Sequence, residues 1–167
     1  MTNVTYLLGA GASANVIPTV NKIEFENKVY SHGLAHEIHM CAIKLKEIAE
    51  VLKHESTVHT LLERCKRFTA DLDWLSAKAS EYGSVDTYAK KLFFQNETSE
   101  LERLKRALSV FLALIQEEKG TDYRYSSFLS KILQKGNFGA EFPPQVKILS
   151  WNYDVQFELS LKKFFSK

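Results

Sequence analysis

Two short segments near opposite ends of the chain carry the residue types best suited to chemistry. The first is Gly9-Ala10-Gly11-Ala12-Ser13-Ala14, which follows the apolar, β-prone run Val4–Leu8. This order fits the G-x-G-x-x-G/A turn, in which backbone N–H groups at a helix start meet a diphosphate. We expect Gly9 to allow the sharp turn, and Gly11 to let a phosphate approach the backbone closely.

The second segment is Asn152-Tyr153-Asp154, which directly follows the apolar run Val146–Ser150. Ligand-binding groups of open α/β sheets gather at the carboxyl ends of the strands. Alternate residues of an extended segment face the same side, so we expect the Asn152 amide and the Asp154 carboxylate to point together. A simpler interpretation is that both residues cap the helix that follows.

The segments between these two motifs are predicted to be almost entirely helical, with strands only at Val4–Leu8 and Val146–Ser150. Apolar residues recur there at spacings of three and four, which is typical of helices packed on one face. Ser84 is a candidate N-cap, and residues 137–145, which include Pro143-Pro144, are predicted to form a loop. The predicted helices are His36–Lys53, Val58–Tyr82, Val85–Phe94, Leu101–Gln116 and Ser126–Gln134.

These elements predict an α/β fold, with a Rossmann-like parallel sheet interrupted by a large all-helical insertion. We expect a single domain over residues 1–167, in which 1–21 and 146–167 supply the Rossmann-like elements and 22–145 form the mostly helical insertion. Two strands alone make a marginal sheet. The chain is therefore expected to be the front part of a larger α/β domain.

Composition narrows the functional classes. The formal net charge is +2 and no segment is dense in Lys and Arg, so we expect no nucleic-acid partner. Charged residues interrupt every long apolar run, so we expect no membrane span and no membrane partner. The N-terminus lacks the pattern of a signal peptide, so we do not expect secretion. Cys41 and Cys65 are interpreted as reduced thiols of a cytoplasmic protein. His32, His36 and His39 lack the further ligands of a metal site, so no metal is expected.

Taken together, the two segments resemble the SIR2 (sirtuin-like) family, in particular its divergent bacterial members in anti-phage defence proteins. The resemblance rests on Gly9–Ser13, on Ile17-Pro18, and on Ser150–Asp154. The last of these is similar to the family's Thr-x-Asn-(Ile/Tyr)-Asp element, with Ser150 in the Thr position.

The resemblance implies that the chain binds NAD and that its full-length form is an NAD hydrolase, which releases nicotinamide and leaves ADP-ribose. Asn152 would be the catalytic residue and would contact the nicotinamide ribose or the attacking water. Asp154 would hold the carboxamide, and Pro18 would fix a loop that closes over the ligand. The implied NAD-binding residues are Gly9, Ala10, Gly11, Ala12, Ser13, Pro18 and Asp154.

Three departures separate the chain from protein-deacylating sirtuins. The segment Val16–Asn21 lacks the aromatic residue and the arginine of their loop, and two cysteines cannot form their zinc quartet. The family's histidine base follows the Asn-x-Asp element, whereas no histidine follows His59 here. We therefore expect weak or no hydrolysis if the 167 residues are the whole protein.

Two alternative functions are considered. The chain could be a non-catalytic sensor that binds NAD or ADP-ribose and signals to a partner, either a second copy or an attached sensor domain. A Rossmann oxidoreductase would instead need an acidic residue at the end of a second strand, about twenty residues after the glycines. Glu37 occupies that region but lies in a predicted helix, which disfavours the oxidoreductase.

Overall fold

The computed structural model describes residues 3–21, 23–25, 28–31, 33–54, 59–137 and 139–165. The chain forms two compact units. The first comprises Met1–Ile17 and Gln116–Lys167, and the second comprises Pro18–Ile115. Both motifs singled out in the sequence, apart from Pro18, belong to the first unit.

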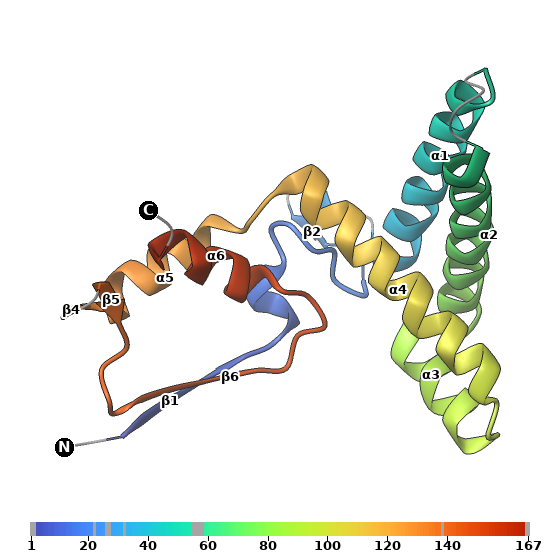
Figure 1. The fold of residues 1–167 in the computed structure, drawn as a ribbon. Helices are drawn as coiled ribbons and strands as arrows, with labels where there is room; N and C mark the ends of the chain where they lie inside the picture. Colours follow the sequence, from blue (N-terminus) through green and yellow to red (C-terminus); the bar gives the residue numbers. More distant parts are fainter. Residues whose placement is uncertain are drawn as a thin grey trace. The chain divides into compact units, whose positions relative to one another are not determined.

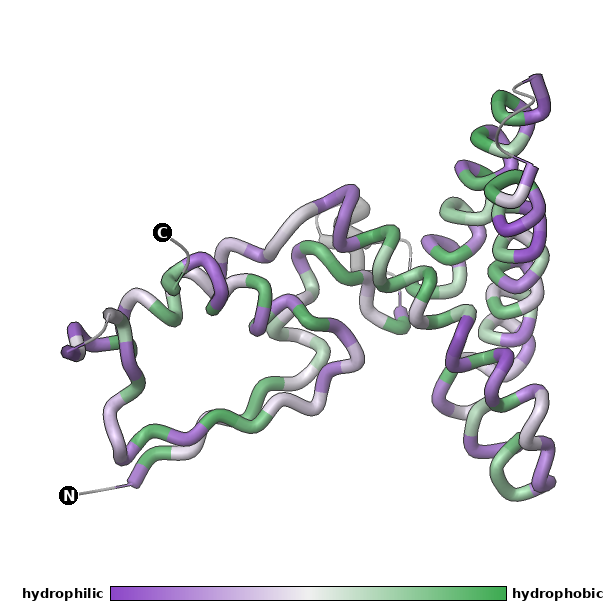
Figure 2. The backbone as a smooth tube through the Cα atoms, in the orientation of Figure 1, coloured by the Kyte–Doolittle hydropathy of each residue, from purple (hydrophilic) through white to green (hydrophobic). Residues whose placement is uncertain are grey.

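The first unit contains the two predicted strands, and they pair in parallel. Strand β1 (Val4–Leu8) runs beside β6 (Val146–Ser150), in a register that begins with Val4 opposite Val146 and ends with Leu8 opposite Ser150 (Figure 1). The ladder extends one step further, because the backbone N–H of Trp151 donates to the carbonyl of Leu8. Figure 2 shows that both strands carry several hydrophobic residues. The fold is therefore mixed α/β and mostly helical, with a small parallel sheet.

Two helices of the first unit pack with this sheet. Tyr125 and Leu129 of α5 (Tyr123–Ile132) form a buried cluster with Phe157 of α6 (Gln156–Phe165). Leu8 and Ile148, one from each strand, pack against that cluster. This apolar core places α5 and the start of α6 next to the carboxyl ends of the strands, where the two motifs lie.

The helix start that the glycine motif predicts after β1 is present as a 3-10 helix of four residues, η1 (Ala10–Ser13). Gly9 precedes it with φ −115° and ψ −178°, an extended conformation that any residue can adopt. The backbone at Gly9 therefore does not itself require a glycine.

The second unit contains three of the predicted helices, each with ends shifted by a few residues at most. Helices α1 (Leu34–Leu52) and α2 (His59–Glu81) lie side by side as a hairpin (Figure 1), and α3 (Val85–Phe94) follows. Ser84 caps α3 as predicted, because its hydroxyl accepts from the backbone N–H of Thr87 at 3.0 Å. Glu37 lies within α1, so the oxidoreductase pattern is not met.

Helix α4 (Thr98–Lys119) is confirmed as well, and most of it belongs to the second unit. It is tied to α2 by Arg103, whose Nε donates to Asp71 at 2.7 Å, and to α3 by Glu100, which accepts from the Tyr88 hydroxyl at 2.6 Å. Within the described residues, no helix is both long enough and apolar enough to cross a membrane. Cys41 and Cys65 are buried and unbridged.

Two antiparallel hairpins were not predicted. Strand β2 (Ile23–Phe25) pairs with β3 (Lys28–Ser31), where helix was expected. Strand β4 (Gln134–Gly136) pairs with β5 (Gly139–Glu141), at the end of the last predicted helix and in the predicted loop. Strands of three or four residues are too short to show a clear alternation of apolar and polar side chains.

Candidate functional site

Four side chains from three separate segments meet at the ends of β1 and β6. The Ser13 hydroxyl lies 3.1 Å from the Asn152 amide nitrogen, 3.0 Å from Asp154 Oδ1 and 2.9 Å from the Tyr125 hydroxyl. The Asn152 amide nitrogen also lies 3.2 Å from the Tyr125 hydroxyl. The structure thus brings the two sequence motifs into direct contact, as expected, and adds Tyr125 from α5.

The chemistry of the four groups fixes the direction of each hydrogen bond. A carboxylate only accepts, so Ser13 donates its single hydroxyl proton to Asp154. The Ser13 oxygen then accepts from both the Tyr125 hydroxyl and the Asn152 amide. The Tyr125 oxygen also accepts from the Asn152 amide nitrogen.

One polar atom of the cluster has no hydrogen-bond partner. The carbonyl oxygen Oδ1 of Asn152 is buried and has no hydrogen-bond partner. The nitrogen of the same amide faces Ser13 and Tyr125, so Oδ1 points away from those two residues. A buried acceptor without a partner is costly and is found most often where a ligand or water completes the bond.

Asp154 also supports the helix that follows it. Its Oδ1 accepts from the backbone N–H of Gln156, the first residue of α6, at 3.0 Å. The capping interpretation therefore holds for Asp154, together with the contact to Ser13. Asp154 is buried, and its predicted contact with a carboxamide stays a prediction.

The glycine turn presents an open backbone surface. Gly9, Ala10 and Gly11 are exposed, and a Cβ added at either glycine would meet no atom within 4 Å. The N–H groups of Ala10 and Gly11 open the 3-10 helix, where no preceding turn offers an acceptor, and neither donates to another described residue. An anion could therefore reach this turn and accept hydrogen bonds from these two N–H groups. A four-residue helix contributes little dipole, so binding of an anion here would depend on these N–H groups.

The other predicted NAD-binding residues of this segment lie differently. Ala12 is half-buried and packs against the apolar core of the first unit. Ser13 is fully buried and its hydroxyl is engaged three times, so in this structure it positions Asn152 and Asp154 rather than facing a phosphate. Pro18 is buried and opens the second unit, so its predicted role as a loop-closing residue stays a prediction.

A second polar cluster, centred on Asp122, supports the first. Asp122 is the N-cap of α5, and its side chain is fully buried. Its carboxylate accepts from the backbone N–H of Asn15 at 3.2 Å and from Arg124 Nη2 at 2.6 Å, while its own N–H donates to the Gln156 amide oxygen at 2.7 Å. Asp122 therefore ties the segment after η1 to the starts of α5 and α6.

Sequence reasoning missed Tyr125, Asp122 and Gln156. Asp122, directly before the first residue of α5, is a recognisable N-cap signal, and it would have extended the predicted helix to its true start. Nothing in the local sequence marks Tyr125 or Gln156, because their partners are distant along the chain.

Burial shifts the acidity of Tyr125. It raises the pKa of the Tyr125 hydroxyl above its ordinary value, and the nearby Asp154 carboxylate acts in the same direction. The hydroxyl is therefore protonated at neutral pH, as its donation to Ser13 requires.

The stability of the first unit is expected to fall in acid because of Asp122. Burial alone would raise the pKa of this carboxyl, but hydrogen bonds from Arg124 and the Arg124 guanidinium charge outweigh burial and hold it below the ordinary 3.8. As the pH falls, the Asp122 carboxyl therefore binds a proton more readily in the unfolded chain than in the folded one. The free energy of unfolding that this difference contributes above pH 4 is lost as the pH falls through the lowered pKa of folded Asp122. Urea unfolding between pH 6 and pH 2 should show a shallower loss in Asp122→Asn. Parallel curves for the two proteins would contradict this assignment.

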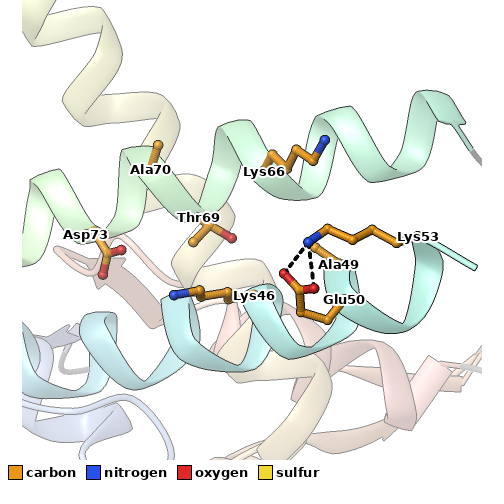
Figure 3. Close-up of a pocket in the computed structure, with 8 residues that line it drawn as sticks. All are labelled: Lys46, Ala49, Glu50, Lys53, Lys66, Thr69, Ala70 and Asp73. Atoms are coloured by element: carbon orange, nitrogen blue, oxygen red, sulfur yellow. Dashed lines mark hydrogen bonds and ion pairs between the residues drawn. The ribbon is translucent and has the colours of Figure 1, made fainter.

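The second unit contains a separate hollow of about 320 Å³ between α1 and α2 (Figure 3). Lys46, Lys53 and Lys66 line it, but Lys53 is already paired with Glu50 at 2.6 Å, and Lys66 with Glu63 at 2.8 Å. All these groups are at least partly solvated, which is typical of a charged helix surface. None of the predicted site residues lines this hollow.

Comparisons with protein-family models, with curated proteins and with solved structures find no match to this chain. Functional inference therefore rests on the geometry of the first unit. Among the residues that the structure describes, no three His, Cys, Asp or Glu side chains are grouped as a metal site would require.

Proposed function

We propose that the first unit binds NAD across the carboxyl ends of β1 and β6, and that this site hydrolyses NAD in the full-length protein. The observation that carries the proposal is the contact of Ser13 with both Asn152 and Asp154, at 3.1 and 3.0 Å. It joins the glycine turn to the Asn-x-Asp element, the two motifs on which the resemblance to the SIR2 family rests. The Rossmann-like description of the sheet is part of this proposal.

The free donors of the glycine turn support the placement of the diphosphate. The N–H groups of Ala10 and Gly11 are available, and the open space at Gly11 lets an anion reach them. Hydrogen bonds to a charged phosphate are about twice as strong as those between neutral groups. The diphosphate is therefore assigned to the turn.

The unpartnered oxygen of Asn152 supports a role at the ribose. Hydrolysis breaks the bond between C1′ and the nicotinamide nitrogen, and the bond's electron pair leaves with nicotinamide. A water oxygen then bonds to C1′, and one water proton is released to solvent. Positive charge builds on the ribose before the water bonds. Asn152 Oδ1 can accept from the attacking water or a ribose hydroxyl, while its dipole stabilises the developing charge.

Asn152→Ala is expected to lower nicotinamide release at least about 100-fold, the usual cost of removing one preorganised polar group from an active site. The measurement is nicotinamide release from NAD by the full-length protein. Asn3→Ala, at an exposed residue just before β1, is the matched control and should keep parental turnover. Equal turnover by Asn152→Ala and the parent would contradict a catalytic role for Asn152.

One observation favours a second candidate, an NAD or ADP-ribose sensor without turnover. The five histidines of the sequence all lie between His32 and His59, and so in the second unit. The first unit thus contains no histidine to serve as a base. Calorimetric binding of NAD without release of nicotinamide would support the sensor over the hydrolase.

A further inference from the structure

The geometry points to Tyr125 as a positioning residue: together with Ser13 it locks the Asn152 amide in the orientation that leaves Oδ1 free to accept from a ligand. No sequence motif marks Tyr125, and its consequence for turnover rests on the proposed function.

The lock follows from the hydrogen-bond count. An asparagine amide can rotate by half a turn and exchange its oxygen with its nitrogen at little steric cost. If the Asn152 amide were reversed, its oxygen would face Ser13 and Tyr125. Ser13 has one proton, which Asp154 takes, so only Tyr125 could donate to the reversed amide. The observed orientation makes two amide bonds with these residues, and the reversed one would make at most one.

Tyr125 is built rigidly enough to act in this way. It is 2% exposed, and its ring meets the Phe157 ring edge-on, with centroids 5.8 Å apart. Asp122 caps the same helix two residues before Arg124, so the start of α5 is fixed as well. The hydroxyl is therefore held at the amide by packing as well as by hydrogen bonding.

Tyr125→Phe tests the lock without requiring NAD. In the parent, the Asn152 amide nitrogen donates to two acceptors, so at least one of its side-chain protons should exchange slowly with solvent in nitrogen-15 NMR spectra. In Tyr125→Phe, the amide loses one of these acceptors, and the slow proton should exchange at least about tenfold faster. Tyr123→Phe makes the same chemical change at an exposed position of the same helix and should leave the exchange as it is in the parent. Unchanged exchange in a folded Tyr125→Phe would overturn the proposal.

A second variant tests the same hydrogen bonds in case Tyr125→Phe does not fold. Ser13→Ala removes the other acceptor of the same amide and should likewise speed the exchange of the slow side-chain proton of Asn152. If Tyr125→Phe does not fold and Ser13→Ala leaves this exchange unchanged, the lock is refuted.

Kinetic measurements then distinguish a role of Tyr125 in positioning Asn152 from a role in the stability of the first unit alone. With the full-length protein, Tyr125→Phe should lower kcat for nicotinamide release by up to about 100-fold, the scale of a misplaced reactive group, with KM for NAD little changed. A parental kcat would contradict a positioning role. If the parent neither binds nor cleaves NAD, the proposed function fails, and the exchange result alone decides whether Tyr125 orients Asn152.

Discussion

Gly11→Val is expected to weaken NAD binding at least about 100-fold, because the new side chain would occupy the space that the diphosphate needs. Loss of two hydrogen bonds to a charged group, each worth about 1.5–3 kcal/mol, accounts for a change of that size. The measurement is the Kd for NAD by titration calorimetry. Retention of the parental Kd would show that the diphosphate does not lie on the turn.

The stability of the first unit should survive this change. A Cβ at Gly11 meets nothing within 4 Å, and the residue is exposed within a 3-10 helix. Exposed substitutions of this kind usually change stability by less than about 0.5 kcal/mol. Ser127→Val, on the exposed side of α5, is the matched control and should change neither stability nor NAD binding. A loss of binding caused by unfolding would be visible as a lowered melting temperature.

Asp122→Ala is expected to destabilise the first unit by about 3 kcal/mol. The change removes an N-cap, worth about 1 kcal/mol, and leaves the backbone N–H of Asn15 without its acceptor. It also removes the partner of Arg124, although the Arg124 side chain is 40% exposed and water can solvate it, which limits the cost of the lost ion pair. Hydrogen exchange of the β1 and β6 amides reports the opening of this unit specifically.

A surface ion pair provides the control for Asp122→Ala. Lys105 and Glu102 lie 2.7 Å apart on α4, and both side chains are 60% exposed. Glu102→Ala should therefore cost less than about 0.5 kcal/mol, as exposed helix pairs do. Similar costs for the two variants would mean that burial of Asp122 has no special effect.

The helices and the parallel strand pair could be predicted because their signals are local. Helical spacing of apolar residues and the cap at Ser84 are visible within a few residues of sequence. The β4–β5 hairpin was missed, since its strands are short and mostly polar.

The candidate site could be predicted only in part, because its arrangement depends on tertiary packing. The motifs place Ser13 near Asn152 and Asp154, but the burial of Ser13 follows from how α5 covers the end of β1. Tyr125 acts through partners more than twenty residues away, a relation that no spacing pattern encodes. Its role emerges only once the hydrogen bonds are assigned.

The most direct test of the NAD site is a titration of the nitrogen-15-labelled protein with NAD. Saturating NAD should shift the backbone amides of Ala10 and Gly11 together with the side-chain amide of Asn152, all with one common Kd. The proposed site would be contradicted if NAD shifted no amide signal at all. It would also be contradicted if NAD shifted only signals of α1 and α2.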